Sequence, residues 1–215
     1  MSHDSSLRSD LVGVCRQLCG KGLVAATDGN VSCRCQDGSV LITPSGISKG
    51  EVGEIDLLRI DARGQLLAGD GEPSSEFRMH LAVYERRPDV GAIVHAHPPL
   101  LTAFTLAGIP FLAEALPEVW LNVGPVPTAP YATPSTPEVV ASIAPYIEGH
   151  QAILLERHGS LTMGKNLKEA YLRLEKLEHA GYTLLYSQIM SGHTPGPLPT
   201  DALAKLAKLK ANVPM

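Results

Sequence analysis

The pattern of hydrophobic and polar positions along this chain switches between a helical and a strand period. Apolar residues spaced three and four apart predict helices, whereas short apolar runs or strict alternation predict strands. The helical pattern occurs in the segments 5–19, 74–87, 98–108, 135–150, 166–190 and 201–211. The strand pattern occurs in the segments 31–35, 40–46, 56–60, 64–70, 91–97 and 151–159. We therefore expect helices and strands to be interleaved along the chain.

Polar residues and prolines predict where several helices begin and end. Ser5 or Ser6 can cap the first helix, because a serine hydroxyl accepts a hydrogen bond from an unpaired backbone N–H group. Ser74 or Ser75 can cap the second helix in the same way. That helix must stop before Pro88, since the residue before a proline disfavours the helical conformation.

The strands near the N-terminus predict hairpins rather than helical crossovers. An Asp-Gly turn at 37–38 joins the first two strands, and the next two strands flank a second short turn. The proline-rich stretch 109–137 predicts loops and brief strands. The sequence contains no internal repeat and no long linker. We expect one domain over residues 1–215, with a mixed or antiparallel sheet and helices on both of its faces.

Composition and charge restrict the class of protein. The chain has 215 residues, of which 44% are hydrophobic and 19% charged, and this composition is typical of a soluble globular protein. Its formal charge of −4 argues against nucleic-acid or anionic-membrane partners. No apolar run approaches the roughly 20 residues that cross a bilayer. The polar first ten residues lack the apolar centre of a secretory signal, so we expect a cytoplasmic protein.

The four cysteines form two close pairs. Cys15 and Cys19 share one face of the first predicted helix, and Cys33 and Cys35 point to one side of a strand. A zinc site built from both pairs is an alternative, but neither spacing is the two-residue gap of a zinc knuckle. We interpret them as free, mostly buried thiols in a reducing compartment.

The strongest chemical signal is a set of histidines at strand ends. His95 and His97 are two apart on a strand that stops at Pro98, so both side chains can reach one ion. A second apolar strand carries His158 to its end. The remaining histidines outside the predicted second helix are interpreted as solvated or packing side chains: His3, His150, His179 and His193. Three imidazoles with an open fourth position are typical of a catalytic zinc site.

Polar turns predict an anion-binding site. Ser74 and Ser75 precede a helix whose first N–H groups are unpaired, which suits an anion, although helix capping alone would explain one serine. Two polar, glycine-containing turns add further candidates: Gly29 with Asn30, and Ser45 with Gly46. The sequence has no glycine-rich nucleotide-binding run. Together these residues predict a small phosphorylated compound rather than a nucleotide.

Glu76 directly follows the two serines. It lies one helical turn before His80, on the same helix face. A carboxylate close to both a metal and a phosphate could act as a general base or acid. A glutamate in a first helical turn is also favoured by the helix dipole alone, so both interpretations stay open at this point.

In their order along the chain, "DGNVS", "LITPSG", "EPSSEFRMH", "VHAHPP" and "LLERHG" resemble the class II aldolase/adducin family. The similarity is strongest to its fuculose-1-phosphate aldolase branch, spans about residues 7–190, and leaves a C-terminal tail at 191–215. The resemblance implies an α/β fold, a three-layer α/β/α single domain with a mixed, largely antiparallel central sheet. It also implies a homotetramer with active sites between subunits.

The resemblance further implies the roles of individual residues. One zinc ion per subunit would be held by His95, His97 and His158, with Glu76 alternating between metal ligand and catalytic base. Imidazole triads also accept manganese or cobalt. The phosphate of the substrate would be held by Asn30, Ser45, Gly46, Ser74 and Ser75.

The implied reaction is the reversible cleavage of a ketose 1-phosphate to dihydroxyacetone phosphate and an aldehyde. The substrate would be of the fuculose or ribulose 1-phosphate type. Zinc acts as a Lewis acid for the enediolate that carbon–carbon cleavage leaves, and Glu76 returns a proton to it. A small phosphorylated ketose is thus the expected partner.

The sequence departs from the fuculose branch at the aldehyde end. That branch has a tyrosine after the "IP" segment, supplied by a neighbouring subunit, whereas this chain offers Glu114, Glu118 or Tyr131 as proton donors. The apolar segment around Leu112 and Trp120 favours short or deoxygenated aldehydes, as from a 5-deoxy or 5-methylthio substrate.

Three rival functions share the resemblance. A methylthioribulose-1-phosphate dehydratase would use the same histidines. A ribulose-phosphate 4-epimerase typically has an aspartate in place of Glu76, which ranks it lower. A non-catalytic module like the adducin head ranks last, because this chain retains the three histidines and the glutamate.

Overall fold

The computed structural model describes residues 3–212, so the outermost parts of the expected domain 1–215 lie outside the described residues. Seven α-helices are described there: α1 (His3–Gly20), α2 (Phe77–Arg86), α3 (Pro99–Leu106), α4 (Pro117–Asn122), α5 (Pro137–Ile143), α6 (Leu167–Ser191) and α7 (Thr200–Asn212). The strands are β1 (Asn30–Arg34), β2 (Val40–Ile42), β3 (Leu58–Ile60), β4 (Leu66–Ala68), β5 (Ala92–Ala96), β6 (Thr128–Ala129), β7 (Ala152–Leu155) and β8 (Gly159–Gly164). Two 3₁₀ turns are η1 (Glu54–Asp56) and η2 (Ala113–Ala115).

All the described strands form one sheet. Its order is β4-β3-β2-β1-β5-β8-β7-β6, and every neighbouring pair is antiparallel except β6 with β7. The hairpins expected from the sequence, β1 with β2 and β3 with β4, are both present. This confirms the prediction of a mixed, largely antiparallel sheet.

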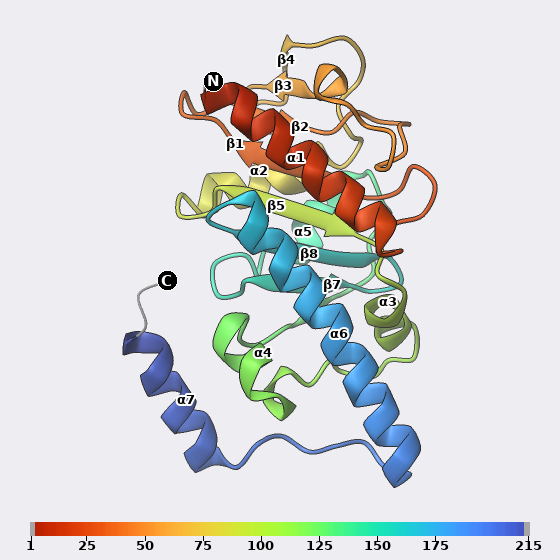
Figure 1. Cartoon of the computed structure of the whole chain (residues 1–215), viewed down its shortest axis with the longest axis vertical. Coiled ribbons are helices and arrows are strands. Elements are labelled where there is room, and N and C mark those ends of the chain that lie inside the picture. Colours follow the sequence, from red (N-terminus) through yellow and green to blue (C-terminus); the bar gives the residue numbers. More distant parts are fainter. Residues whose placement is uncertain (1–2, 213–215) are drawn as a thin grey trace.

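Helices cover both faces of the sheet and make three layers (Figure 1). On one face, buried residues of α1, α3 and α6 pack in a common cluster with strand residues such as Val31 and Val94. On the other face, α2 and α5 pack in a second cluster with strand residues such as Ile93 and Leu161. The α/β/α arrangement expected for the chain is therefore confirmed.

The alternation of side chains along β1 and β5 selects which face receives polar groups. Val31 and Cys33 of β1 belong to the cluster under α1 and α6, so Asn30 and Ser32 point to the opposite face, toward α2. On β5, Ile93 belongs to the α2 face, and His95 shares that face. The backbones of Asn30 and His95 are direct partners in the β1–β5 ladder. Asn30 and His95 therefore lie side by side on the sheet face that α2 covers.

Several element boundaries differ from the expectation. The helix α1 begins at His3, so Ser5 and Ser6 lie inside its first turn and do not precede it as caps. The helix α5 ends at Ile143 instead of continuing to residue 150, because Pro145 lacks the backbone N–H group that would continue the helical hydrogen bonds.

Two elements were not expected. The proline-rich stretch 109–137 contains the short helix α4 in addition to the loops and the brief strand β6, with Pro117 at the first helical position. The segment after His158 forms β8, which returns antiparallel along β7 and also pairs with β5. This strand lies inside the sheet and is buried on both faces, so its residues do not alternate between apolar and polar. Its small and polar residues also form no apolar run, and the sequence therefore gives no strand signal here.

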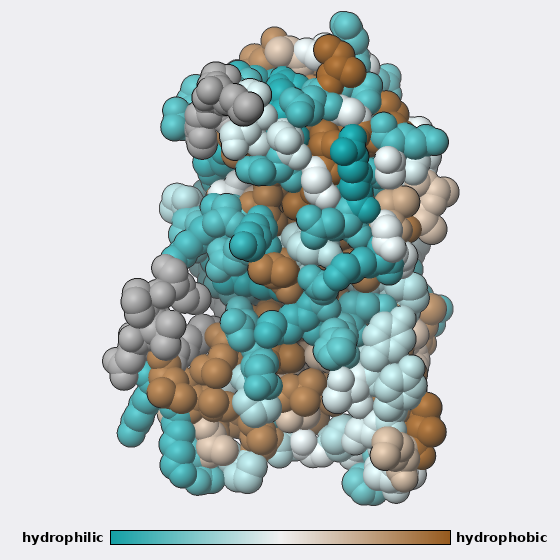
Figure 2. All heavy atoms as spheres, viewed as in Figure 1, coloured by the Kyte–Doolittle hydropathy of each residue, from teal (hydrophilic) through white to brown (hydrophobic). Residues whose placement is uncertain are grey.

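Within the described part of the chain, no helix is long and apolar enough to cross a membrane. Hydrophobic side chains nevertheless gather over α4 and α7 on the face drawn in Figure 2. All four cysteines are free thiols: Cys15, Cys33 and Cys35 are buried, and Cys19 is exposed. The structure therefore agrees with the interpretation of the cysteines as mostly buried thiols.

Candidate active site

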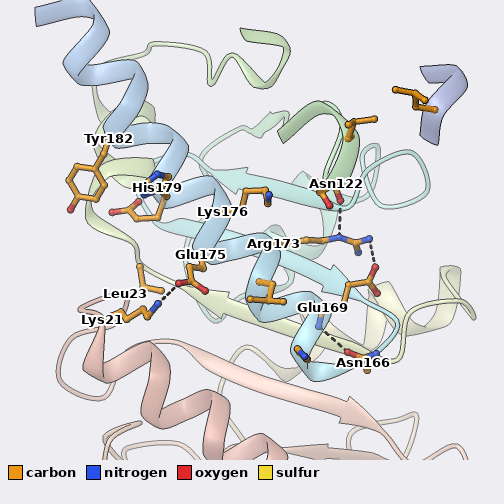
Figure 3. A pocket seen from close by; sticks show the side chains of 15 residues that line it. Lys21, Leu23, Asn122, Asn166, Glu169, Arg173, Glu175, Lys176, His179 and Tyr182 are labelled. Carbon is orange, nitrogen blue, oxygen red and sulfur yellow. Dashed lines mark hydrogen bonds and ion pairs between the residues drawn. The ribbon is translucent and has the colours of Figure 1, made fainter. Parts of the chain in front are cut away.

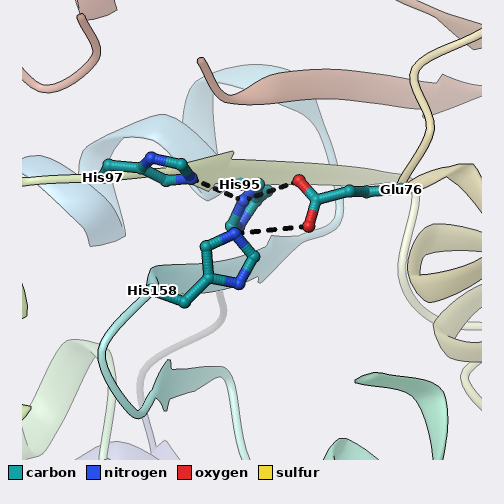
Figure 4. Close-up of side chains that lie close together, drawn as sticks. All are labelled: Glu76, His95, His97 and His158. Carbon is teal, nitrogen blue, oxygen red and sulfur yellow. Dashed lines mark hydrogen bonds and ion pairs between the residues drawn. The ribbon is translucent and has the colours of Figure 1, made fainter. Parts of the chain in front are cut away.

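Three separate parts of the fold bring the predicted metal ligands together (Figure 4). His95 lies in β5, and His97 follows the end of that strand. His158 lies in the turn between β7 and β8, and Glu76 immediately precedes α2. Their potential ligand atoms all lie within 4.8 Å of one another. Among the described residues, these four form the only group of acidic, histidine or cysteine side chains able to hold a metal ion.

The four side chains converge on one point. The Nε2 atom of His95 lies 3.0 Å from Glu76 Oε2 and 3.0 Å from the Nε2 atom of His97. The Nε2 atom of His158 lies 3.3 Å from Glu76 Oε1. The centres of the three rings are 4.8 to 4.9 Å apart, with interplanar angles of 61° to 70°. Such mutually inclined rings aim their nitrogens inward, as ligands of one ion do.

Polar contacts on the far side of two rings indicate which nitrogen faces the cluster. His95 Nδ1 lies 3.0 Å from the backbone carbonyl of Ser160, which can only accept, so Nδ1 carries the proton. His97 Nδ1 lies 3.5 Å from the Asp28 carboxylate, which favours the same tautomer. The two Nε2 lone pairs then face each other and Glu76. Lone pairs so close repel unless a cation lies among them, so the donor set fits a metal ion.

The pKa shifts describe the same arrangement. Burial by itself would raise the pKa of Glu76, but the neighbouring His95 and His158 outweigh burial and hold that pKa below its usual range. Burial lowers the pKa of His158 to about 4, with a further contribution from His95. Burial also lowers the pKa of His97. At neutral pH, Glu76 is therefore a carboxylate, and His97 and His158 are neutral imidazoles, the forms that bind divalent metals.

A pocket of about 230 Å³ adjoins the cluster. His97, His158 and Glu76 form one part of its lining. The rest of the lining includes all of the predicted anion-binding residues: Gly29, Asn30, Ser45, Gly46, Ser74 and Ser75. The structure thus brings together three polar turns that are far apart in the sequence, on the side of the histidines that faces the pocket.

The serines before α2 do not cap it, contrary to the expectation. The residue that precedes the helix is Glu76, and no side chain caps it. Ser75 instead forms a hydroxyl–hydroxyl hydrogen bond of 2.7 Å with Ser135 from the loop before α5. The Ser74 hydroxyl accepts a long bond of 3.4 Å from the Glu76 backbone. Both serines line the pocket.

Asn30 lies in the pocket wall with both ends of its amide engaged. Its Nδ2 donates to Glu76 Oε2 at 3.0 Å, and its Oδ1 lies 2.5 Å from His80 Nε2. Only 2% of the residue is exposed. Direct contact between Asn30 and a phosphate stays a prediction, whereas its contact with the Glu76 carboxylate is a feature of the structure.

The candidate proton donors lie elsewhere in this chain. None of Glu114, Glu118 and Tyr131 belongs to the residues that line the pocket in the described part of the chain. Tyr131 is 56% exposed, and its backbone N–H donates to Glu156. The other histidines are also separate from the cluster: His179 and His193 are exposed, and His150 packs on Tyr146.

Several residues of the site escaped the sequence analysis. Asp28 orients His97, and Ser135 bonds to Ser75. Asp28 directly precedes the predicted turn at Gly29, and this position could have identified it as a candidate site residue. No sequence pattern around Ser135 indicates a role in the site. The sequence places His80 one turn after Glu76. Its hydrogen-bond partners follow only from the three-dimensional fold, in which α2 packs beside β1.

A larger groove of about 1160 Å³ runs along the outer side of α6 (Figure 3). Lys21 pairs with Glu175 at one end, and Arg173 bonds to Glu169 farther along α6. The groove shares no lining residue with the pocket beside the histidines. Among the described residues, its mixed charges contain no cluster of metal ligands, so we consider the smaller pocket the candidate site.

Known proteins resemble this chain over nearly all of its length. The 5-methylthioribulose-1-phosphate/5-deoxyribulose-1-phosphate aldolase of Rhodospirillum rubrum is 33% identical over 201 residues, which are 94% of this chain and 89% of the relative. The 3-oxo-tetronate 4-phosphate decarboxylase of Escherichia coli K12 is 32% identical over 179 residues, or 81% and 84% of the two chains. A solved L-fuculose 1-phosphate aldolase superposes with a TM-score of 0.86 at 31% identity and 97% coverage of both chains.

The family model described as "Class II Aldolase and Adducin N-terminal domain" matches residues 9–185. The match includes Glu76 and the three histidines of the cluster, as well as the residues that line the adjoining pocket. With this match, the sheet topology and the relatives in agreement, the chain belongs to the class II aldolase/adducin family.

Proposed function

We propose that this protein is a zinc-dependent aldolase that reversibly cleaves a ketose 1-phosphate to dihydroxyacetone phosphate and an aldehyde. One observation carries the proposal: three inward-facing imidazoles and a carboxylate adjoin a pocket lined by hydroxyl groups and polar turns. A molecule with a phosphate at one end and a carbonyl beside a hydroxyl at the other matches both halves of this pocket.

The ligand set supports zinc in particular. Three histidine nitrogens and one carboxylate oxygen are typical zinc ligands, and manganese or cobalt can occupy similar sites. His95, His97 and His158 would hold the ion, with Glu76 as a ligand that can be displaced. A divalent cation held there would stabilise the negative charge that carbon–carbon cleavage leaves on the substrate oxygens.

The residues of the chain would position the substrate and move its protons. The hydroxyls of Ser45, Ser74 and Ser75 would hold the phosphate, so that the carbonyl carbon is placed toward the histidines. Glu76 is a carboxylate at neutral pH, because the neighbouring histidines lower its pKa although burial opposes this. It can therefore accept a proton from the bound substrate and return that proton to the three-carbon product.

The preferred substrate in this proposal is a 5-deoxy or 5-methylthio ribulose 1-phosphate. Relatives from Rhodospirillum rubrum and Bacillus thuringiensis bear these names, at 33% and 32% identity. The apolar residues Leu112 and Trp120 supply a hydrophobic segment around η2 and α4. That segment does not line the pocket of its own chain, so we infer that a neighbouring subunit of a homotetramer brings it to the aldehyde end.

Decarboxylation is a second candidate, because a relative with similar coverage is named a 3-oxo-tetronate 4-phosphate decarboxylase. Loss of carbon dioxide from a 3-oxo acid also leaves negative charge on a carbonyl oxygen, which the same cluster could stabilise. The dehydratase and the epimerase remain alternatives of the same kind. These reactions differ in their products, so product analysis separates them.

The test is a panel of ketose 1-phosphates and 3-oxo-tetronate 4-phosphate, incubated with the zinc-loaded protein. Dihydroxyacetone phosphate is followed with a coupled dehydrogenase, and carbon dioxide, diketone and epimer are measured in parallel. Release of dihydroxyacetone phosphate in equal amount with an aldehyde is the expected result. Carbon dioxide from the tetronate with no triose phosphate from any ketose would replace aldol cleavage by decarboxylation.

A further inference from the structure

A buried chain of hydrogen bonds leads from Glu76 into the layer between α2 and the sheet. Asn30 Nδ2 contacts Glu76 Oε2 at 3.0 Å, and Asn30 Oδ1 contacts His80 Nε2 at 2.5 Å. On the other side of the ring, His80 Nδ1 lies 2.6 Å from the Ser32 hydroxyl, which lies 2.8 Å from the Tyr84 hydroxyl. Ser32 and His80 are fully buried, and Asn30 and Tyr84 are at most 4% exposed.

The chemistry of each group allows a single direction of donation along this chain. The carbonyl oxygen of Asn30 can only accept, so His80 Nε2 carries a proton. Burial lowers the pKa of His80 to about 3, so the ring is neutral and its Nδ1 is an acceptor. Ser32 must then donate to Nδ1, and the Ser32 oxygen accepts from the Tyr84 hydroxyl.

We propose that His80 is a positioning residue, whose Nε2–H group holds the Asn30 amide in the one orientation that presents its NH₂ group to Glu76. This inference rests on the proposed function, in which Glu76 alternates between metal ligand and proton carrier. If the amide turned over, its oxygen would face the Glu76 carboxylate and its NH₂ group would face the N–H of His80. Both contacts would be repulsive, so the histidine selects the orientation that supports the carboxylate.

The fold also fixes the position of Asn30 relative to its two partners, Glu76 and His80. Asn30 begins β1, and its backbone pairs directly with His95, so its position relative to the cluster is set by the sheet. His80 lies one turn after Glu76 on α2, so both partners of Asn30 come from one helix. A side chain that only filled space here would not need four consecutive polar contacts in a buried layer. These contacts instead determine which end of the Asn30 side-chain amide faces Glu76.

Two substitutions at position 80 separate positioning from packing. In H80Q the longer amide can place an NH₂ group near the position of Nε2 and keep the donor to Asn30. In H80N the shorter amide reaches only the position of Nδ1, so the contact with Ser32 can survive while the donor to Asn30 is lost. Both variants are polar and smaller than histidine, which makes them matched controls for burial and cavity formation.

The expected result is a lower kcat in H80N than in H80Q, by about tenfold or more, with a smaller change in KM for the ketose 1-phosphate. Zinc affinity, measured by chelator competition, should also be lower in H80N than in H80Q. Thermal unfolding of the two variants should be similar. Equal kcat and equal zinc affinity in the two variants, or losses that follow their unfolding temperatures, would overturn the proposal.

A measurement on the wild-type protein tests the role of His80 independently of the proposed reaction. The nitrogen chemical shifts of His80 in the zinc-loaded protein report its tautomer, with assignment by loss of the signals in H80Q. We expect a neutral ring with the proton on Nε2. A proton on Nδ1, or on both nitrogens, would refute the assigned role even if aldol cleavage is observed. If no ketose is cleaved but the tautomer and the zinc affinities agree, the proposed reaction fails and the positioning of Glu76 stands.

Discussion

The side chain of Glu76 has different surroundings at its two carboxylate oxygens. Its Oε2 contacts both Asn30 and His95, whereas its buried Oε1 has no hydrogen-bond partner among the described residues and lies 3.3 Å from His158 Nε2. A buried carboxylate oxygen without a donor is costly. Coordination of a cation would remove that cost, which connects the geometry of this residue with the proposed metal.

The substitution Glu76→Gln removes the negative charge and the basic oxygen while preserving size. We expect turnover to fall by several orders of magnitude, because an amide cannot accept and return the substrate proton. Zinc should remain bound, since the three histidines are unchanged. Steady-state kinetics together with metal analysis checks both parts. A variant that contains zinc and retains the wild-type rate would exclude Glu76 as the proton carrier.

His80 also predicts a dependence of stability on pH. Its pKa in the folded protein is about 3 because of burial and the nearby His95, with Glu76 opposing the shift. The unfolded value is about 6.5, so between these values the unfolded chain binds a proton that the folded protein does not. The free energy of unfolding should therefore decrease as pH falls below about 6.5, by up to about 1.4 kcal/mol per pH unit from this residue.

Urea unfolding of the metal-free wild type and of H80Q at pH 7 and pH 5 measures this contribution. The wild type should lose more stability than H80Q over this interval, because the glutamine has no titrating group. Using metal-free protein for both variants excludes the effect of zinc release at low pH. The same loss in the two proteins would show that His80 is not buried in its neutral form.

The residues that the structure gathers in the histidine cluster and the pocket could be selected from the sequence because each one stands beside a recognisable local pattern. His95, His97 and His158 follow apolar runs, and the polar residues of the pocket belong to turns that contain glycine or serine. The functional partners Ser135 and His80 were not predictable in this way. Their contacts depend on the pairing of distant segments, which no local pattern contains.

Among the secondary-structure elements, the antiparallel pairing of β5 with β8 determines where the histidines meet. Gly159 begins β8 directly after His158, and a Cβ atom added there would lie 2.4 Å from the Ala96 carbonyl oxygen and 2.8 Å from the His97 ring. The strands can therefore approach closely only if this position is glycine.

The substitution Gly159→Ala should force β8 away from β5. We expect a loss of about 1–3 kcal/mol in the free energy of unfolding, because the obstructing atom belongs to the backbone. We also expect weaker zinc binding, since His97 and His158 are both displaced. Gly149→Ala is a matched control, because no atom lies within 4 Å of the added Cβ. Similar stability and zinc affinity in the two variants would contradict the close approach of the strands.

Two loops of the pocket are joined by a buried lysine. The Lys49 ammonium group donates to the backbone carbonyls of Thr27 at 3.0 Å and Ile47 at 2.7 Å, and the residue is 1% exposed. Burial lowers the pKa of Lys49. These carbonyls belong to the turns that precede Asn30 and follow Ser45, so one side chain connects both.

The substitution Lys49→Met should remove this connection and leave two carbonyls without their donor. We expect the free energy of unfolding to fall by about 1–3 kcal/mol, and KM for the ketose 1-phosphate to rise more than kcat falls. Denaturant unfolding and steady-state kinetics provide the measurements. The exposed Lys168 serves as the control through Lys168→Met. Unchanged KM in the Lys49 variant would show that the two turns keep their places without it.

Most elements follow from sequence because their periods and their end signals agree. The long helix α6 is capped by Asn166, whose side chain accepts from the Glu169 backbone, and it ends at Gly192 in the left-handed conformation. The strand β8 and the helix α4 were missed for different reasons. The former carries small and polar residues at the centre of the sheet, and the latter is a short helix among prolines.

In the whole molecule, a single chain supplies both the cluster of three histidines with Glu76 and the polar turns of the adjoining pocket. In the described part of the chain, no residue of the segment around Leu112 and Trp120 lines that pocket, so the proposed aldehyde site lacks this segment. A homotetramer with active sites between subunits would supply it from a neighbour, and this assembly remains our proposal. Light scattering should then give a mass of four chains of 22.9 kDa each. A monomer with full activity would exclude a contribution from a second subunit.

We propose that one metal ion per chain, held by the three histidines and Glu76, makes the protein an aldolase. Titration of the metal-free protein with zinc, while release of dihydroxyacetone phosphate from a ketose 1-phosphate is recorded, tests it most directly. We expect no release without metal, and a rate that rises linearly and levels off at one equivalent of zinc per chain. Full release from the metal-free protein, or a rate that does not respond to zinc, manganese or cobalt, would contradict it.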